Sequence, residues 1–584
     1  MIKRLFSFFA LICCITSVHY AQDCVEPVYT WPMAGSTHIN VKSNIILKYG
    51  DYAIPSNIDA DDFKIEGNLS GQMELEIIKV SDSKTLLLEP IFDFQPCDKI
   101  NVRIKCFNQS GEDYEFDFTT SCDPVNLNSK NPGKEVAQKA LTLPPDFPEI
   151  GIELYGQTAE GDIFLTTAGS MGTFFNVIID NTGDVKYFDA TKNFDFKVID
   201  GDKLISFDQS NQVRKFIMLD TNYAQIDSFQ CGNGYMTDFH DIDILPNGNA
   251  LVICDDKRTI DMSAIVPGGD SMASVSGGII QEIDKTTKNV VFQWSSFDHF
   301  NFTDNIHDAD LTASNITYVH LNSVQLTDDG NILISSRRMD EVTKIDRNTG
   351  QIIWRLGGKN NDFTFVNETD TFCNQHHARE IDNGNITIFD NANFKAHPPR
   401  AVEYQIDETA LTATKVWEQY HDIIKKADVM GSIQRLDNGN SLICWGTVEK
   451  NEANVTEYAL DGTRLFELFI DSTYGIIKSY RAYRFKWPDI KTNIRKINPD
   501  PFELTVSPNP FNSVLGISLN MQEKEWINIT ISTIDGRMQE VVYNGVANKG
   551  MQNFDFDGHH LSSGIYLCTV RLNNRTYFKK LIKQ

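Results

Sequence analysis

The sequence predicts an all-β protein in which a six-bladed β-propeller is preceded by an Ig-like β-sandwich and followed by a smaller β-sandwich. Three observations support this prediction. The 584 residues are too many for one hydrophobic core. Short strands of alternating polar and apolar residues occupy both ends of the chain. Between them, a turn followed by an apolar strand recurs six times.

The first residues, MIKRLFSFFALICCITSVHYAQ, are typical of a secretory signal peptide. A basic start precedes an apolar run, and the small residue Ala21 follows it. We therefore predict a signal peptide over residues 1–21. A lipoprotein cysteine at Cys13 or Cys14 is the alternative, but the preceding residues fit that pattern poorly. No later segment has the ~20 apolar residues that a membrane helix needs.

Charge and cysteine content restrict the partners and the compartment. The formal net charge of −26 argues against binding to nucleic acid or to anionic membranes. Nine cysteines remain after the signal, and a secreted chain encounters an oxidising compartment. Four of them predict two disulfides of unknown connectivity: Cys24, Cys97, Cys106 and Cys122. The odd total leaves at least one thiol free among the other five: Cys231, Cys254, Cys373, Cys444 and Cys568.

Residues 22–122 form the predicted Ig-like sandwich. Runs such as NIILKYG, MELEIIKV and KINVRIKCF alternate in polarity and are separated by Asn, Asp, Gly and Pro clusters. A linker rich in Pro, Asn and Lys is predicted over 123–149.

Residues 150–490 contain the repeat that predicts the propeller. Six turn-and-strand segments align with one another: EGDIFLTT, DGDKLISF, NGNALVIC, DGNILISS, NGNITIFD and NGNSLICW. Each is followed by a closing strand, and four strands make one blade around a central channel. Three insertions rich in Asp, Asn, Gly and Phe are expected to cover one face, at 255–278, 296–318 and 359–375.

Residues 498–584 read as seven short strands with Asp-Gly and Ser-Gly turns. The segment includes SPNPF at 507–511, an IDGR turn, LSSGIY at 561–566 and a KKLIK ending. It resembles the C-terminal sorting domain of the type IX secretion system. That resemblance implies recognition by the secretion machinery, export across a bacterial outer membrane, and a secreted or cell-surface location.

The positions of the histidines within the repeat predict a site on the propeller axis. The residues seven positions before each turn residue begin the first strand of each blade: Glu153, Asn193, His240, Asn322, His376 and Gly431. First strands line the channel, so these positions should converge. Because side chains alternate along a strand, residues two positions earlier should share that face: Asp238, His320 and Asn374.

Two interpretations of these histidines compete. A single histidine at a strand start is usually a structural group, but three at matching repeat positions favour a functional cluster. Arg337 or Arg338, at the end of ILISSRR, can point into the same channel. Imidazoles beside a guanidinium suit sulfate, phosphate or carboxylate, and the guanidinium argues against a metal ion at this place.

Aromatic residues divide into two groups. Trp294, Trp354 and Trp417 occupy one place in three closing strands and are predicted to pack between blades. Candidate substrate-binding rings are Phe239, Phe363 and Trp445, which lie nearer the proposed site or its covering loops.

The propeller resembles the bacterial arylsulfate sulfotransferases, which need no phosphoadenosine phosphosulfate. The residues that carry this resemblance are HDIDILPNGN at 240–249, HLNSV at 320–324, SSR at 335–337, IIWRLGG at 352–358 and QHHAREIDNGNITIFDN at 375–391. It implies a nucleophilic His376, supported by His240, His320, Asn322 and Arg337. His377 and Arg338 directly follow two of these residues, so either assignment could shift by one.

The resemblance implies ping-pong transfer of a sulfuryl group from an aryl sulfate to a phenol through a sulfated histidine, with neither cofactor nor metal. His240 would exchange the proton, and Asp241 or Asp238 would set its tautomer. A homodimer is compatible with the resemblance. Two alternatives are a metal-dependent lyase or oxidoreductase that uses the three histidines as ligands, and a non-catalytic adhesin or glycan-binding protein.

Overall fold

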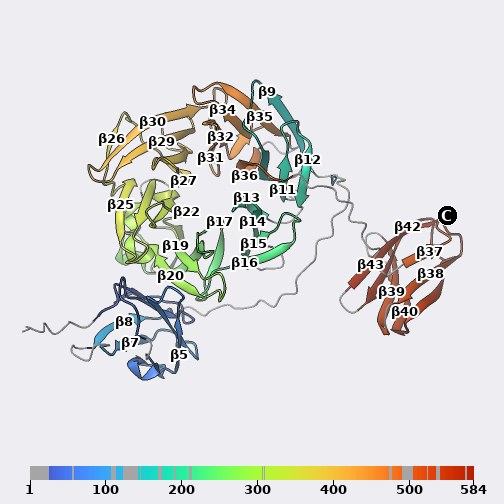
Figure 1. Ribbon diagram of the computed structural model, residues 1–584, viewed down its shortest axis with the longest axis horizontal. Coiled ribbons are helices and arrows are strands. Elements are labelled where there is room, and N and C mark those ends of the chain that lie inside the picture. The colour runs from blue at the N-terminus through green and yellow to red at the C-terminus, as the bar shows by residue number, and fades with distance from the viewer. Residues whose placement is uncertain are drawn as a thin grey trace, which may run out of the picture. The chain divides into compact units, whose positions relative to one another are not determined.

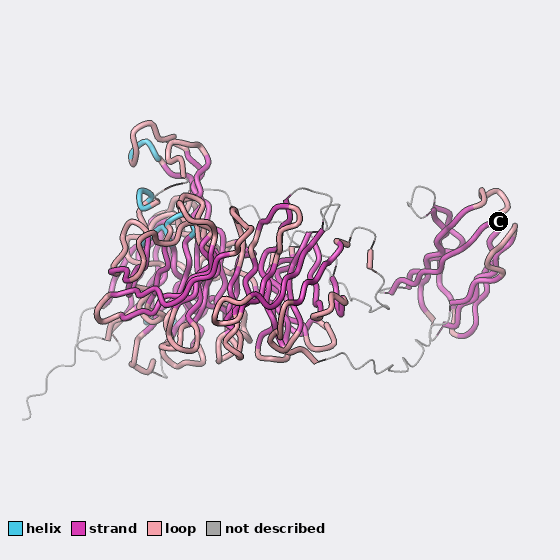
Figure 2. Tube along the Cα trace, turned by 90° about the horizontal axis from the view of Figure 1, so that it is seen from above, coloured by secondary structure: helices cyan, strands magenta, loops and turns pink. Residues whose placement is uncertain are grey.

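The computed structural model is almost entirely strands and loops, with a few short helical turns (Figure 2), so the all-β prediction is confirmed. The predicted signal peptide and most of the predicted linker lie outside the residues that the structure describes. The described residues are 25–55, 58–106, 113–122, 143–144, 147–168, 174–189, 193–209, 214–305, 307, 309–471, 476–488, 504–521, 524–533, 539–572 and 575–584.

Two four-stranded antiparallel sheets form the N-terminal part of the chain. The first has the order β1-β2-β6-β5, with bounds Tyr29–Trp31, Ile45–Lys48, Thr85–Pro90 and Leu75–Lys79. The second has the order β4-β3-β7-β8, with bounds Gly71–Gln72, Phe63–Gly67, Lys99–Ile104 and Tyr114–Thr119. In β7, every second residue is buried, as expected of a strand with one face on a core. A disulfide joins Cys97 to Cys122, and Cys106 is also disulfide-bonded.

Six further sheets of the described residues are arranged in a ring (Figure 1). The innermost strands touch their neighbours in a closed circle, in the order β36, β13, β17, β22, β27 and β31. The six aligned turn-and-strand segments all become the second strand of a sheet, directly outside the inner one, in β10, β14, β18, β23, β28 and β32. The repeat therefore identified the same structural position six times.

The second, third and fourth sheets each contain four consecutive strands. The second comprises β13 to β16: Asn193–Ile199, Lys203–Asp208, Lys215–Leu219 and Gln225–Phe229. The third comprises β17 to β20: Met236–Ile244, Ala250–Ile260, Ala273–Ile283 and Val290–Ser295. The fourth comprises β22 to β25: Leu321–Leu326, Ile332–Ser336, Glu341–Ile345 and Ile352–Gly357. The fifth adds β26, Thr364–Val366, to the outer edge of β27 to β30: His376–Glu380, Ile386–Asp390, Arg400–Asp407 and Thr412–Tyr420.

Strands from distant parts of the sequence complete the other two sheets. The first contains β10, β11 and β12, with bounds Asp162–Ala168, Phe174–Ile179 and Val185–Asp189. Its inner positions are filled by β36, Ile476–Phe485, and by β33, Thr447–Glu449. The sixth contains β31, β32, β34 and β35, with bounds Ser432–Arg435, Ser441–Cys444, Val455–Tyr458 and Arg464–Asp471. Its outermost strand is β9, Glu149–Leu154, from the start of this region.

The way in which distant strands complete the first and sixth sheets corrects one sequence-based expectation. Glu153 was expected on an inner strand that lines the channel, but it lies on β9 and pairs with Glu467 of β35 at the outer edge of the sixth sheet. The inner position of the first sheet is taken by β36 instead. Residues of β36 therefore reach the axis, although no repeat position indicated them.

The three predicted insertions form short elements. Residues 255–278 mostly extend β18 and β19 into a long hairpin, with a 3-10 turn at Met262–Ala264. Residues 296–318 contain helix α1, Ser296–His299, a 3-10 turn at Phe302–Asp304, and β21, Asn315–Thr317, which pairs with β19. Residues 359–375 contain β26.

Aromatic and aliphatic side chains fill the spaces between sheets and join the N-terminal part to the ring. Trp294 and Trp354 are buried, as predicted for packing residues, and Trp417 is half-buried beneath the Arg435 guanidinium, 3.9 Å from its ring centre. The Tyr29 hydroxyl donates a hydrogen bond of 2.5 Å to the Gln293 carbonyl in the third sheet. The described residues up to Trp487 form one compact unit.

Residues 488–584 form a second unit with its own core. Its seven described strands, the number predicted, make one sheet of β37, β38 and β41, and another of β40, β39, β42 and β43. Their bounds in chain order are Leu504–Ser507, Val514–Met521, Glu525–Thr533, Gln539–Ala547, Gly550–Asp557, Gly564–Leu572 and Arg575–Lys583. The IDGR turn lies outside the described residues.

Candidate active site

Three neighbouring inner strands are irregular at the level of the predicted histidines. The strand pairing shifts at matching places: between Thr237 and Ile242, between Leu321 and Ser323, and between His376 and Arg379. His320 and His377 have left-handed backbones, each with φ of 54°. Such bulges re-aim side chains. The expectation of strict two-residue alternation through this level is therefore wrong, and contacts must identify which side chains meet.

His376 is buried at the start of β27, and its partners define its tautomer. Its Nδ1 lies 2.7 Å from the Asn391 side-chain oxygen. The Asn391 amide nitrogen donates to the carbonyls of Ala427 and Met430, at 2.5 and 3.0 Å. Because these bonds fix the amide's orientation, the oxygen faces His376 and accepts the Nδ1 proton. Nε2 keeps its lone pair, toward which the Met430 N–H points at 3.3 Å.

Burial, followed by the positive charge of Arg337, lowers the pKa of His376 well below its ordinary value. A neutral imidazole with an unprotonated Nε2 is the form that can act as a nucleophile. Asn391 was not among the predicted site residues. The sequence nevertheless contained a signal for it, because Asn391 is the last residue of the QHHAREIDNGNITIFDN stretch.

His377 uses both ring nitrogens in contacts within the structure. Its Nδ1 accepts a hydrogen bond from the Ile433 N–H at 3.4 Å, and its Nε2 lies 3.2 Å from the Tyr483 hydroxyl. These partners belong to β31 and β36. The charges next to the two rings also differ. Arg337 and His240 act on His376, whereas Arg379 and Arg481 act on His377, so His376 is the one beside the predicted site residues.

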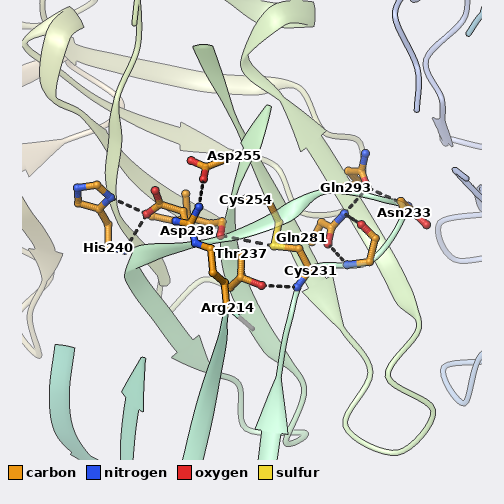
Figure 3. Close-up of a disulfide and its surroundings, with 12 residues drawn as sticks. Arg214, Cys231, Asn233, Thr237, Asp238, His240, Cys254, Asp255, Gln281 and Gln293 are labelled. Atoms are coloured by element: carbon orange, nitrogen blue, oxygen red, sulfur yellow. Dashed lines mark hydrogen bonds and ion pairs between the residues drawn. A yellow bond between two sulfur atoms is a disulfide. The ribbon is translucent and has the colours of Figure 1, made fainter. Parts of the chain in front are cut away.

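His240 is oriented by Asp238 rather than by Asp241, the other residue considered from the sequence. Its Nδ1 lies 2.5 Å from an Asp238 oxygen, which also accepts the His240 backbone N–H at 2.7 Å (Figure 3). Burial alone would raise the pKa of Asp238, but His240 lowers it below the usual value. The carboxylate thus holds a proton on Nδ1 and leaves Nε2 of His240 for proton exchange.

A second carboxyl group and a disulfide support this arrangement. Asp255 on the adjacent strand is bound by Arg214 at 2.7 Å (Figure 3), and burial together with the charge of Asp238 raises its pKa to about 6. The neighbouring residue, Cys254, forms a disulfide with Cys231. The Cys231 N–H in turn donates to the Thr237 hydroxyl at 2.9 Å, one residue before Asp238.

His320 and Arg337 lie close to the other two histidines. The rings of His240 and His320 are 4.8 Å apart at 69°. Burial and then the charges of His240, His376 and Arg337 lower the pKa of His320 well below its ordinary value. Arg337 begins the 3-10 turn Arg337–Met339 after β23, and its backbone N–H donates to the His320 carbonyl at 3.0 Å. Its guanidinium donates to the Asp428 carbonyl at 3.3 Å.

Asn322 holds the backbone beside His376. Its side-chain nitrogen donates to the Gln375 carbonyl at 2.7 Å, immediately before His376. Its own backbone carbonyl accepts a 2.6 Å bond from Arg481 of β36. These two bonds hold the backbone next to His376 in place.

Five charged side chains form a buried layer next to the histidines, which we call the axial charge cluster: Lys197, Arg379, Arg481, Asp195 and Asp241. Asp241 contacts all three cations, and their charges hold its pKa well below the usual range although burial would raise it. Asp243, a third carboxyl group, interacts with Arg379 and Lys197. Of the cluster, Arg481 is among the positive charges that lower the pKa of His376. Sequence reasoning missed Arg481 because the repeat did not identify β36.

The three predicted substrate-binding rings lie in different environments. Phe239 is half-buried and stacks on His240, with ring centres 4.1 Å apart. Phe363 is 4% exposed and packs edge-on against Trp354. Trp445 is fully buried and donates to the Thr456 hydroxyl at 3.0 Å. Only Phe239 of these three therefore adjoins the histidine cluster.

Residues 198–470 match the family model of arylsulfotransferase (ASST), and residues 505–584 match that of the secretion system C-terminal sorting domain. The first match covers most of the ring but slightly less than half of the chain. This family supports a sulfotransferase-like function for the ring. The sorting domain implies that the chain is exported to the cell surface or secreted. Among the described residues, no helix has the length and apolar character to span a membrane.

Other comparisons give weaker similarities. No curated protein sequence matches the chain. Among solved structures, a virginiamycin B lyase from Staphylococcus aureus has 9% identity and a TM-score of 0.28, and covers 55% of this chain and 100% of its own. A hydrazine synthase from Kuenenia stuttgartiensis has 14% identity and a TM-score of 0.27. That match covers 53% of this chain and 98% of the hydrazine synthase chain. Similarities at this level support no argument about function.

Proposed function

We propose that the arylsulfotransferase domain transfers a sulfuryl group from an aryl sulfate to a phenol through a sulfated His376. The observation that carries this proposal is the environment of His376, a buried neutral imidazole whose Nδ1 proton is bound by Asn391 and whose Nε2 is unprotonated. Arg337 and Arg481, whose charges lower the pKa of His376, suit an anionic sulfate ester.

In the first half of the cycle, the Nε2 lone pair of His376 attacks sulfur. The N–S bond forms while the S–O bond to the aryl group breaks, and the aryl oxide leaves. His240 begins the cycle with a proton on each ring nitrogen and gives its Nε2 proton to that oxide. In the second half, a phenol loses its proton to His240 and its oxygen attacks the sulfated histidine, which restores neutral His376. The cycle requires neither a nucleotide nor a metal ion.

Arg337 and His320 stabilise the charge that develops on the sulfuryl oxygens. Donors of this kind contribute on the order of 3 kcal/mol each when they are positioned before the reaction. The Met430 N–H, which makes only a 3.3 Å contact with Nε2, is displaced by the incoming sulfur. Phe239, stacked on His240, provides an apolar surface for the aryl ring.

Incubation of the purified chain with an aryl sulfate, with and without a phenol, tests the proposal. We expect release of the donor phenol and a mass increase of one SO₃ group on the peptide that contains His376. His376→Asn should abolish both signals, whereas His377→Asn should retain the adduct. Absence of both phenol release and adduct in the folded wild-type chain would overturn the proposal.

We also propose that the chain loses its signal peptide and forms a homodimer. Residues 1–21 are proposed to be removed on export, and N-terminal sequencing of the exported protein checks this. A homodimer, compatible with the family resemblance, is checked by sedimentation of the purified chain.

A further inference from the structure

We propose that His307, Asp340 and Cys373 form a zinc site, separate from the reacting histidines. One ligand atom from each of these residues lies within 4.8 Å of the other two. This is the one group of three His, Cys, Asp or Glu side chains with that property among the described residues. His240, His320 and His376 do not form such a group.

Three separate segments contribute the donors. His307 lies between the 3-10 turn Phe302–Asp304 and β21, in the insertion of the third sheet. Asp340 ends the 3-10 turn of Arg337 and has a left-handed backbone with φ of 50°. Cys373 lies in the segment that leads into β27, three residues before His376. A bound ion would therefore join parts of the third, fourth and fifth sheets.

The donor set suits zinc in ligand type and in charge. Imidazole nitrogen, carboxylate oxygen and thiolate sulfur are the three ligand types that Zn²⁺ takes in proteins. On binding, the Cys373 thiol releases its proton to solvent, so that two anionic ligands neutralise the charge of the ion. Asp340 and Cys373 are buried, whereas the His307 side chain is 31% exposed and leaves a route for entry and for a fourth ligand from solvent.

Outer contacts already orient the donors. One Asp340 oxygen accepts the Asn374 N–H at 2.7 Å, which leaves the other oxygen 3.0 Å from His307 Nε2. The His307 ring stacks on Phe394, with centres 4.8 Å apart and planes at 17°. Hydrogen bonds and packing of this kind fix the geometry of first-shell ligands in metal sites. The structure therefore contains both the ligands and their supports.

The proposed ion would brace the active site without taking part in the chemistry. Asp340 directly follows the turn that carries Arg337, and Cys373 precedes the nucleophile by three residues. Zinc binding does not depend on the sulfuryl-transfer proposal, because it is measured without substrate.

Titration of the full-length, chelator-treated protein with Zn²⁺ and with Co²⁺ tests this inference. The wild type should bind one tight equivalent of zinc, and the cobalt form should show thiolate-to-metal charge-transfer absorption. Cys373→Ser should abolish that absorption. His307→Gln should weaken zinc binding by more than about tenfold, since loss of even an outer partner costs that much. Cys444→Ser and His559→Gln are matched controls, because Cys444 is a buried free thiol and His559 an exposed histidine of the second unit.

Either of two results would overturn the proposal. One is a wild-type cobalt form without thiolate charge-transfer absorption. The other is a zinc stoichiometry and affinity that are equal in the wild type and in His307→Gln. If Cys373→Ser does not fold, His307→Gln still tests the proposal. His307 is partly exposed, so its replacement should not disturb the buried core.

Discussion

A single amide fixes the protonation of the proposed nucleophile. The Asn391 side chain donates to two carbonyls of the segment before β31, so its oxygen can only accept from His376. Without that acceptor, the Nδ1 proton loses its partner in a buried site, and the tautomer with a proton on Nε2 becomes accessible. Asn391 therefore acts as a positioning residue that keeps the attacking nitrogen unprotonated.

Asn391→Ala is expected to reduce kcat by roughly 10–100-fold, the range found when a partner that orients a metal-bound imidazole is lost. Initial rates with an aryl sulfate and a phenol measure this effect. Asn393→Ala is the matched control, because Asn393 makes a similar bond to the Asp428 carbonyl but does not contact His376. Equal rates for the two variants would contradict the positioning role.

The pH dependence of sulfation should reflect the lowered pKa of His376. Only the neutral imidazole attacks, and burial together with Arg337 lowers its pKa from the ordinary value of 6.5. As pH falls, the decline in rate that is caused by protonation of His376 should therefore begin only below 6.5. Arg337→Gln removes the nearby charge, raises the pKa of His376 and moves this decline to higher pH.

Single-turnover phenol release across a pH series measures the pH at which the rate declines on the acid side, which we call the acid limb. This pH can be compared between proteins even if Arg337→Gln has a lower maximal rate. Arg103→Gln, an exposed arginine of the N-terminal sheets, is the control and should leave the limb unchanged. An acid limb at the same pH in wild type and Arg337→Gln would show that the guanidinium does not act on the nucleophile.

The sequence predicts those site residues that occupy matching positions of the repeat. It does not predict site residues that lie elsewhere in the repeat or in the segments between strands. His240 and His376 occupy the same repeat position, and the structure brings both to the axis. Asn391 follows the second strand of its sheet and reaches His376 only because the chain turns there. Phe363 and Trp445 are aromatic residues near the site in sequence, but their burial among other side chains depends on neighbouring sheets.

At the scale of elements, local patterns predicted the strands but not the closure of the ring. Turn residues followed by β-branched strands fixed the second strand in all six sheets. The first and sixth sheets are completed by strands that pair across more than 300 residues of sequence. No short-range sequence pattern specifies such a pairing. For this reason Glu153 was placed on an inner strand, and β36 was overlooked.

The closing strand β36 places Arg481 within the axial charge cluster. Arg481 is 2% exposed and contacts Asp195 and Asp241 at 3.0 Å each. Arg481→Met would leave these carboxylates with fewer cations, and breaking a buried ion pair in this way costs about 3–5 kcal/mol. Urea denaturation should show that loss. Lys486→Met is the control, because its pair with Glu160 is exposed and should contribute little. Equal unfolding midpoints for both variants would contradict this assignment.

The Cys231–Cys254 disulfide stabilises the strand that carries His240. It closes a segment with a sequence separation of 23, for which loss of the cross-link costs about 3 kcal/mol. The double Ser variant should therefore have a lower melting temperature. Its kcat should also fall, because Asp238 follows Thr237, which is bound to Cys231. Cys444→Ser, which removes a buried thiol outside any disulfide, is the comparison. A double variant as stable as this control would show that the disulfide is dispensable.

At the scale of the whole molecule, folding and sorting are assigned to different parts of the chain. Trp487 still packs on Phe164 in the ring, with centres 6.0 Å apart, whereas residues 488–584 have a core of their own. A chain that ends at residue 490 should therefore retain the melting temperature and kcat of the full chain. Because it lacks the sorting domain, it should remain in the periplasm, which cell fractionation and calorimetry measure.

A second truncation makes this prediction specific to the position of the cut. A chain that ends at residue 470 lacks β36, so the first sheet loses its inner strand, and Asp195 and Asp241 lose Arg481. This shorter chain should not fold, although it differs from the first by only about 20 residues, because an open ring leaves unpaired strand edges and buried carboxylates with fewer cations. If both chains melted at the temperature of the full protein, β36 would not be the strand that closes the ring.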